Sequence, residues 1–371
     1  MDRREQEVMK VRLDEVFLDE NIYPRIKKSE KLIDELIDAL SVGAKLPPIE
    51  VQKVRFQAEK SEETRIILLD GWHRLEAYRG YNSQKGVKPI EEVEARFWRP
   101  ETFDYKENLA ELMVRSAELN MKHGLRLSRG EAKAHLQKMA RLSENPFVIN
   151  WKGIAEKFDV TPQWVSECVS DILAERRMSR DAFIYKLSLL GWTQKEIMGT
   201  TEEIKTQSTI SEIIGELKKL NSTIQNDFYV KRKPIDEIVK YYHLNTPLAW
   251  AIILEGKSDL ERFKLFGDPD YQDDSPRVYN VWNFANCDPR LGDEHPGRVP
   301  GQIVLNLLYY YTEQGELVVD PMAGGGSTID ACLVMGRKCR AYDINPIRKD
   351  IVKWNLYDGF PKRQKGVTSS F

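Results

Sequence analysis

The chain has 371 residues, of which 41% are hydrophobic, and a formal net charge of -2 at neutral pH. This length corresponds to about two to three domains. The charge gives no whole-chain signal for nucleic-acid binding, although nine basic and three acidic residues lie between Arg337 and Lys365. No apolar run approaches the ~18 residues of a membrane span, and no signal-peptide core opens the chain. We therefore expect a cytoplasmic protein without a membrane partner.

The cysteines show no spacing that is typical of a metal site. The chain has four of them, Cys168, Cys287, Cys332 and Cys339, and no CxxC pair. We expect ordinary thiols in a reducing cytoplasm and predict no bound metal.

The first predicted domain covers residues 1–104, where short strand-like and helical segments alternate. Residues 11–19, 49–54 and 65–70 are strand-like, and residues 30–43 have the period of an amphipathic helix. The third strand leads into a glycine turn with a histidine and an arginine at the start of a helix. Free backbone N–H groups at such a turn favour phosphate. The candidate phosphate-binding residues are Gly71, His73 and Arg74. The open alternative is a capped helix whose arginine pairs with a nearby acid.

These segments occur in the order found in the ParB/sulfiredoxin superfamily, which the N-terminal part of the chain resembles. The matching strings are NIYPR at 21–25, the helix at 30–43, LPPIEV at 46–51 and DGWHRLEA at 70–77. The resemblance covers roughly residues 8–100. It implies a small α/β domain that binds a nucleoside triphosphate at the turn with Gly71 and Arg74. His73 departs from the second arginine of partition proteins, and the turn holds no cysteine for sulfiredoxin chemistry.

Residues 105–267 are predicted to be almost wholly helical, as two regions that meet near residue 180. Residues 151–172 are predicted to form a helix-turn-helix, with Thr161 as N-cap and Pro162 in the first helical position. The open alternative is a plain helical hairpin. The exposed positions expected to contact DNA are Gln163, Trp164, Ser166 and Glu167.

Two further helical pairs, at residues 191–217 and 234–254, are candidates for the same motif. The last is the weakest, because the open alternative is that Trp250 and the two isoleucines after it are core residues. A basic triplet precedes the last pair and is expected to contact phosphates: Lys231, Arg232 and Lys233. Helix-turn-helix segments after a ParB-like domain agree with the layout of that family. Double-stranded DNA is therefore the expected partner, and a homodimer is compatible with this layout.

The last predicted domain, residues 268–371, contains a strand, a glycine-rich turn, a helix and a second strand. The strands are expected at 317–319 and 339–343, and the helix at 327–336. Glycine lets the backbone approach a ligand closely, and the acid that ends the second strand suits a ribose diol. The spacing is not GxGxxG, although another Rossmann-like nucleotide binder remains the open alternative.

The strings HPGRVP, DPMAGGGS and DINP together resemble the amino-methylating DNA methyltransferases, over about Tyr279 to Phe360. The resemblance implies a partial Rossmann-like domain that uses S-adenosylmethionine (SAM). The residues that it assigns to the cofactor are His295, Pro296, Asp320, Pro321, Ala323, Gly324, Gly325, Gly326, Ser327, Asp343 and Asn345.

The catalytic tetrapeptide of that family, Asp/Asn/Ser-Pro-Pro-aromatic, is not found in the chain. The nearest string, Asp268 to Tyr271, is predicted to be a linker turn. The chain ends 28 residues after Asp343, so we expect the catalytic half to be missing or separate. A frameshift near residues 363–371 is our hypothesis for this ending.

The sequence thus predicts a multidomain protein with α/β and all-α parts. It has a small ParB-like domain, a helical middle and a partial methyltransferase domain. One interpretation is a DNA amino-methyltransferase acting on adenine N6 or cytosine N4. The other is a partition or regulatory DNA-binding protein with a vestigial SAM domain. A mobile-element origin suits both interpretations.

Overall fold

The computed structural model describes residues 8–58, 61–122, 127–201, 203–267, 276–277, 284 and 286–355. The chain divides into two compact units, Met1–Ala174 and Glu175–Phe371. Both α-helices and β-strands occur in each unit, so the predicted mixed α/β character is confirmed. None of the helices within the described ranges is long and apolar enough to cross a bilayer.

The first unit is built on a mixed sheet with the strand order β1-β5-β3-β4-β2, and β6 pairs with β3. Its longest strands, β3 and β4, are antiparallel neighbours, whereas β5 runs parallel to β3. The strands are β1 (Val8–Arg12), β2 (Val16–Phe17), β3 (Ile49–Ala58), β4 (Ser61–Asp70), β5 (Glu92–Phe97) and β6 (Phe103–Asp104). The strands predicted at 49–54 and 65–70 are therefore present. The strand predicted at 11–19 was wrong in its centre, where a 3-10 helix lies between β1 and β2, and β5 and β6 were not predicted.

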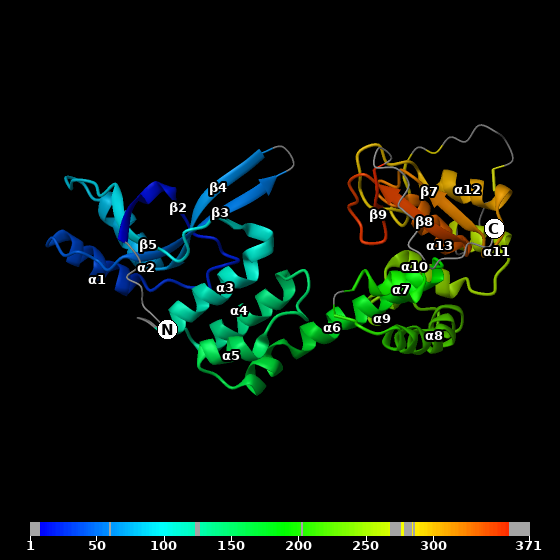
Figure 1. The fold of residues 1–371 in the computed structure, drawn as a ribbon, viewed down its shortest axis with the longest axis horizontal. Helices are drawn as coiled ribbons and strands as arrows, with labels where there is room; N and C mark the ends of the chain where they lie inside the picture. Colours follow the sequence, from blue (N-terminus) through cyan, green and yellow to red (C-terminus); the bar gives the residue numbers. More distant parts are fainter. Residues whose placement is uncertain are drawn as a thin grey trace. The chain divides into compact units, whose positions relative to one another are not determined.

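Helices cover both faces of this sheet (Figure 1). Successive strand residues point to opposite faces: Leu68 packs with α1 and α2, whereas Ile67 and Leu69 pack in the core that α3 to α6 share. The helices of this unit are α1 (Glu30–Ser41), α2 (Trp72–Asn82), α3 (Tyr105–Lys122), α4 (Arg129–Leu142), α5 (Trp151–Phe158) and the first part of α6 (Pro162–Leu189). A short 3-10 helix, Leu13–Glu15, separates β1 from β2.

The second unit begins with a helical group around one fully buried helix, α10 (Thr246–Ile253). An apolar helix without a polar face is stable only when protein surrounds it, and all residues from Pro247 to Ile253 are buried. The helices around it are α7 (Gln194–Met198), α8 (Gln207–Tyr229), α9 (Ile235–Tyr242) and α11 (Asp259–Gly267). The predicted helical character of residues 105–267 is thus confirmed for the part that the structure describes.

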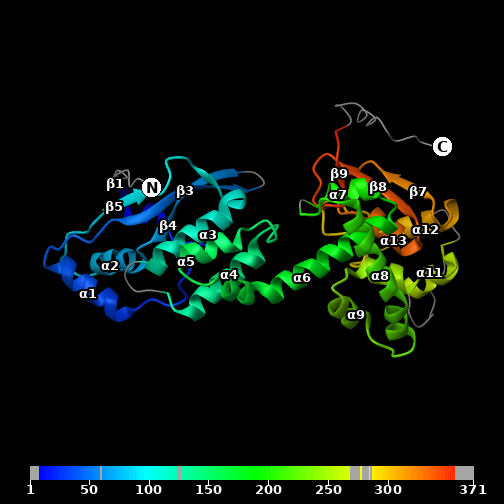
Figure 2. The ribbon, with the colours of Figure 1, turned by 60° about the horizontal axis from the view of Figure 1, so that its bottom comes forward.

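The predicted strand–turn–helix–strand unit near the end of the chain is confirmed (Figure 2). Strands β7 (Leu317–Asp320), β8 (Lys338–Asp343) and β9 (Val352–Lys353) are parallel neighbours in that order. Helix α12 (Gly301–Tyr311) precedes β7, and helix α13 (Ser327–Met335) connects β7 to β8. The turn between β7 and α13 is therefore at the carboxyl end of β7, beside the carboxyl end of β8.

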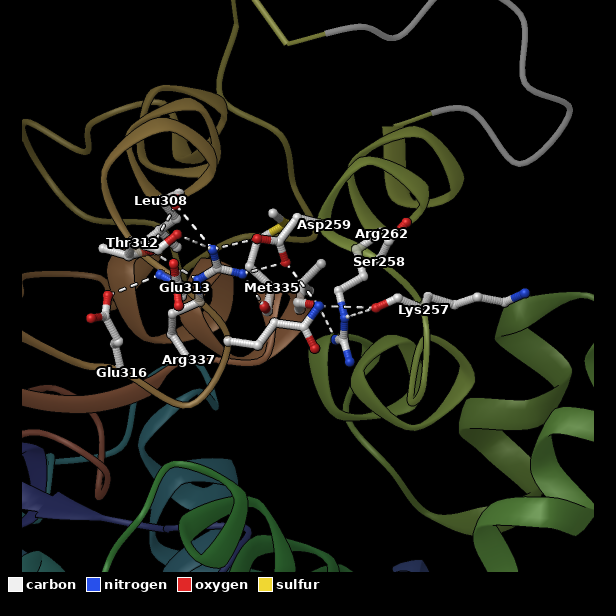
Figure 3. A network of polar contacts seen from close by, with 12 residues as sticks. Lys257, Ser258, Asp259, Arg262, Leu308, Thr312, Glu313, Glu316, Met335 and Arg337 are labelled. Carbon is white, nitrogen blue, oxygen red and sulfur yellow. Dashed lines mark hydrogen bonds and ion pairs between the residues drawn. The ribbon is translucent and has the colours of Figure 1, made fainter.

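One buried arginine, Arg337, joins three helices of this unit (Figure 3). Its guanidinium donates two hydrogen bonds of 2.7 Å to the carboxylate of Asp259, in the first turn of α11. It also donates to the carbonyl oxygens of Leu308 and Thr312, at 3.1 and 2.7 Å. Carbonyls at a helix end lack partners within the helix. Arg337 therefore satisfies the end of α12 while it neutralises an acid of α11.

Candidate cofactor site

The glycine-rich loop is a tight turn between β7 and α13. The Gly326 N–H donates to the Ala323 carbonyl oxygen at 2.7 Å, and the Ala323 N–H donates to the Tyr342 carbonyl oxygen of β8 at 2.9 Å. Gly324 and Gly326 have φ angles of 48° and 81°. Glycine adopts this left-handed region without the steric penalty of a Cβ. The loop geometry thus depends on glycine at these two positions.

The Asp343 carboxylate lies directly against this loop. Its Oδ2 atom accepts a hydrogen bond from the Gly324 N–H and its Oδ1 atom from the Asn345 N–H, both at 2.9 Å. The backbone N–H groups of Asn345 and Gly324 hold the pKa of Asp343 below its usual range. An ionised carboxylate has about four lone-pair positions, so acceptor positions remain for ligand hydroxyls. This donor and acceptor set fits a ribose diol beside the loop.

The segment before α12 contacts the glycine-rich loop. The Asp293 N–H donates to the Gly325 carbonyl oxygen at 2.8 Å. A Cβ added to Gly324 would lie 3.3 Å from the His295 ring. Arg298 stabilises the segment, because its guanidinium donates a hydrogen bond to the Leu291 carbonyl oxygen at 2.7 Å. The structure therefore brings His295, the glycines and Asp343 together from three separate stretches of sequence.

The remaining predicted cofactor residues divide into exposed and buried positions. The Asp320 Oδ1 atom accepts from the Met322 N–H at 3.0 Å, and Pro321 is exposed beside it. Pro296 and Asn345 are also exposed. Ser327 is buried, and its hydroxyl donates to the Leu291 carbonyl oxygen at 3.3 Å. Ser327 thus supports the loop from within the protein in this structure.

The sequence did not reveal four charged residues behind the loop, whose side chains are at most 10% exposed. These are Lys186, Asp330, Arg348 and Asp350, which form ion pairs with one another. Only Asp330 stood out in the sequence as a charged residue that could be buried, because it is the one acid in the first turn of a mostly apolar helix. Nothing in the sequence near Lys186 pointed to its acidic partner, which lies 144 residues away.

In the first unit, the predicted phosphate turn takes the arrangement in which the arginine pairs with an acid. Gly71 has a φ of 106° and caps α2. Arg74 donates to Asp70 at 2.7 Å and to the Pro48 carbonyl oxygen at 2.6 Å. The buried His73 accepts from the Ser29 N–H at 3.0 Å, and burial lowers its pKa. A nucleotide role for these residues stays a prediction.

The helical pair α5–α6 has the predicted turn but a much longer second helix. The Thr161 hydroxyl accepts from the Trp164 N–H at 3.2 Å, which agrees with an N-cap. Gln163 and Ser166 are exposed, as predicted. Trp164 is partly buried and packs against the core, so its prediction as a fully exposed position was wrong. A large ring covering apolar neighbours is stabilised by that burial.

The basic triplet near residue 231 is only partly available to a ligand. The Asp227 carboxylate is buried and accepts from Lys231 at 2.7 Å and from Lys233 at 2.9 Å. Arg232 is exposed, with a φ of 56°. In the third helix-turn-helix candidate, the residues of α10 from Pro247 to Ile253 are buried, so Trp250 and the isoleucines beside it are core residues. The nearest catalytic-like string, residues 268–271, lies outside the described residues.

Two known protein sequences or families resemble the part of the chain that contains this site. Residues 181–353 match the model of the N6_N4_Mtase family, described as DNA methylase. The DNA adenine methyltransferase YhdJ of Escherichia coli (strain K12) is 25% identical over 244 residues, which cover 58% of this chain and 77% of the relative. The matched range contains the glycine-rich loop, Asp343 and most of the helical group. The second half of the chain is therefore similar to DNA methylases over this range.

Proposed function

We propose that the second unit binds SAM in front of the glycine-rich loop and serves methyl transfer to an exocyclic amine of DNA. The amine would be adenine N6 or cytosine N4. The observation that carries the proposal is the Asp343 carboxylate, held by the Gly324 N–H at the carboxyl ends of two parallel strands. Ligands of open α/β sheets bind at this edge. The family match over residues 181–353 supports DNA as the substrate.

Each residue of the site has a definite task in this proposal. Asp343 would accept hydrogen bonds from the ribose hydroxyls, and the glycines would allow close approach of the ligand to the backbone. His295 would enclose the ligand from the segment before α12. When bound, the cofactor supplies an electrophilic methyl group. The base that receives it must leave the stack of the duplex.

For the first unit we propose DNA binding by a ParB-like domain with a helix-turn-helix. The exposed Gln163 and Ser166, on the helix after the turn, are the proposed base contacts. Exposed Arg232, in the second unit, is a proposed phosphate contact. A nucleotide at Gly71 and Arg74 would have to compete with Asp70 for the arginine. A homodimer and a mobile-element origin remain part of this proposal.

The alternative function is DNA binding without methyl transfer. It shares the DNA partner with the first function and differs from it in the transfer step. The two functions differ in a direct experiment with the full chain. Tritium-labelled SAM should be retained by the protein, and label should then pass to double-stranded DNA in the first function. Retention of DNA without transfer of label would support the second.

Replacing Asp343 by alanine should weaken SAM binding by roughly ten- to a hundredfold, because bonds to a charged acceptor contribute about 1.5–3 kcal/mol. Isothermal titration calorimetry measures this change. Asp343→Asn should lose less, because the amide oxygen still accepts hydrogen bonds. Glu216→Ala removes an exposed carboxylate of α8 and is the matched control. Unchanged affinity in Asp343→Ala would refute the assignment of this residue.

A further inference from the structure

The four charged residues behind the loop, Lys186, Asp330, Arg348 and Asp350, are called here the buried quartet. The exposed fractions of their side chains are 2%, 5%, 10% and 3%, respectively. Two are cations and two are anions, so the quartet is neutral as a group. Lys186 comes from α6 and Asp330 from α13, whereas the other two precede β9. All four belong to the second unit.

Arg348 is the centre of the quartet. Its guanidinium donates to both oxygens of Asp330, at 2.8 and 2.9 Å, and to both oxygens of Asp350, at 2.9 and 2.7 Å. Lys186 donates to the same two carboxylates, at 3.2 and 2.8 Å. Burial by itself would raise the pKa of Asp330 and Asp350. Arg348 and Lys186 outweigh burial and hold the pKa of both acids below the usual range.

The quartet is bonded to the cofactor loop at its back. Arg348 Nη1 donates to the Gly325 carbonyl oxygen at 3.1 Å, which also accepts from the Asp293 N–H. The Asp330 Oδ2 atom accepts from the Gly292 N–H at 2.8 Å. A Cβ on Gly326 would lie 2.6 Å from Arg348 Nη1. Arg348 therefore fixes one peptide of the loop, and a larger residue in place of Gly326 would have to displace its guanidinium.

A contribution to folding stability does not explain well why four charged side chains lie together in the interior. Desolvating buried charges costs several kcal/mol per ion, and well-packed apolar residues often stabilise a fold equally well. Charged groups do impose directional bonds, which apolar packing does not. In this molecule the directional bonds end on the Gly325 carbonyl oxygen and on the segment that carries His295.

We propose that the buried quartet sets the conformation of the glycine-rich loop for SAM, with Arg348 as a positioning residue that acts through the Gly325 carbonyl oxygen. The proposal rests on the proposed SAM site. Arg348 does not touch the ligand in this scheme. It holds the peptide after Gly325 so that the opposite side of the loop, with the Gly324 N–H and Asp343, keeps one geometry.

The test compares Arg348→Met with Arg337→Met in the full chain. Both remove a buried arginine of the same unit, but Arg337 bonds to helix ends and not to the loop. SAM affinity is measured by calorimetry below the unfolding temperature of each variant, and amide hydrogen exchange is followed for peptides covering residues 320–327. Arg348→Met should bind SAM roughly ten- to a hundredfold more weakly, as for a lost bond to a charged group. Its loop amides should exchange faster, whereas Arg337→Met should keep the parental affinity within about threefold.

The outcomes separate this inference from the proposed function. A parent protein that binds no SAM would overturn the cofactor site. Parental affinity and parental loop exchange in Arg348→Met would overturn the positioning role while the cofactor site stands. Should Arg348→Met fail to fold, Arg348→Lys serves instead, because it keeps the charge balance but cannot bond both acids and Gly325 together. Parental affinity in a folded Arg348→Lys would equally overturn the inference.

Discussion

Replacing Arg337 by methionine is expected to lower the unfolding free energy of the second unit by about 3–5 kcal/mol. The side chain of Arg337 is fully buried, whereas that of Asp259 is 25% exposed. Methionine would fill much of the space but would donate no hydrogen bond. Asp259 would lose its cation, and the Thr312 carbonyl oxygen would lose its Arg337 donor, whereas the Leu308 carbonyl oxygen would keep the Thr312 N–H at 3.2 Å. Buried acceptors left without a donor retain their desolvation cost.

Urea unfolding, followed by hydrogen exchange of peptides from α11 to α13, measures this loss. Arg177→Met removes the same charge from an exposed position of α6 and should change the unfolding free energy by no more than about 0.5 kcal/mol. A second variant, Asp259→Leu combined with Arg337→Met, should lose less than the two single losses added together. An unfolding free energy of Arg337→Met within 1 kcal/mol of the parent would contradict the prediction.

Acidification from pH 7 to pH 4 should destabilise the first unit through one buried histidine, His135 of α4. Burial lowers its pKa from 6.5 to about 4. One ring nitrogen lies 3.0 Å from the Met113 carbonyl oxygen, and the other has no partner among the described residues. The unfolded chain binds a proton near pH 6.5, whereas the folded one does not until about pH 4. Stability is therefore full above pH 6.5 and falls by about 3 kcal/mol as the pH drops to 4.

The matched variant is His135→Gln, which keeps a donor for the Met113 carbonyl oxygen but does not titrate. Unfolding free energies of parent and variant are measured from pH 4 to pH 7, again with exchange of peptides from α3 and α4. Other groups, His73 among them, titrate in both proteins and cancel in the difference. The parent should lose about 3 kcal/mol more than the variant over this range. If the unfolding free energies of parent and variant fell in parallel with pH, the prediction would be contradicted, because the fold would then not lower the pKa of His135.

Much of the local structure could be predicted from the sequence because it depends on residues near one another. Strand-like segments at 49–54 and 65–70, the second with a continuous apolar run, predicted parts of β3 and β4, and the helical period predicted α1. An apolar run, the glycines after it and a second short strand that ends in an acid predicted the β7–α13–β8 unit. The sequence analysis did not predict the contact between Gly324 and Asp343, which the structure shows at the carboxyl ends of two adjacent parallel strands.

Contacts between distant segments were decided by the tertiary structure. Trp164 looked exposed from its position in the helix, but the core of the first unit partly covers it. Lys231 and Lys233 looked free to contact DNA, but the fold places the buried Asp227 between them. In both cases the partner of the side chain comes from a contact in the folded chain, which the spacing of residues in the sequence does not show.

The sequence by itself determined α1, the β7–α13–β8 unit and the glycine-rich turn within it, because these elements depend on the spacing of residues near one another. Only the tertiary structure decided how that turn is held. Lys186 and Asp330 are 144 residues apart, and their ion pair forms only after α6 and α13 pack together. A buried charge must find its partner wherever the chain brings one, since leaving it unpaired costs several kcal/mol.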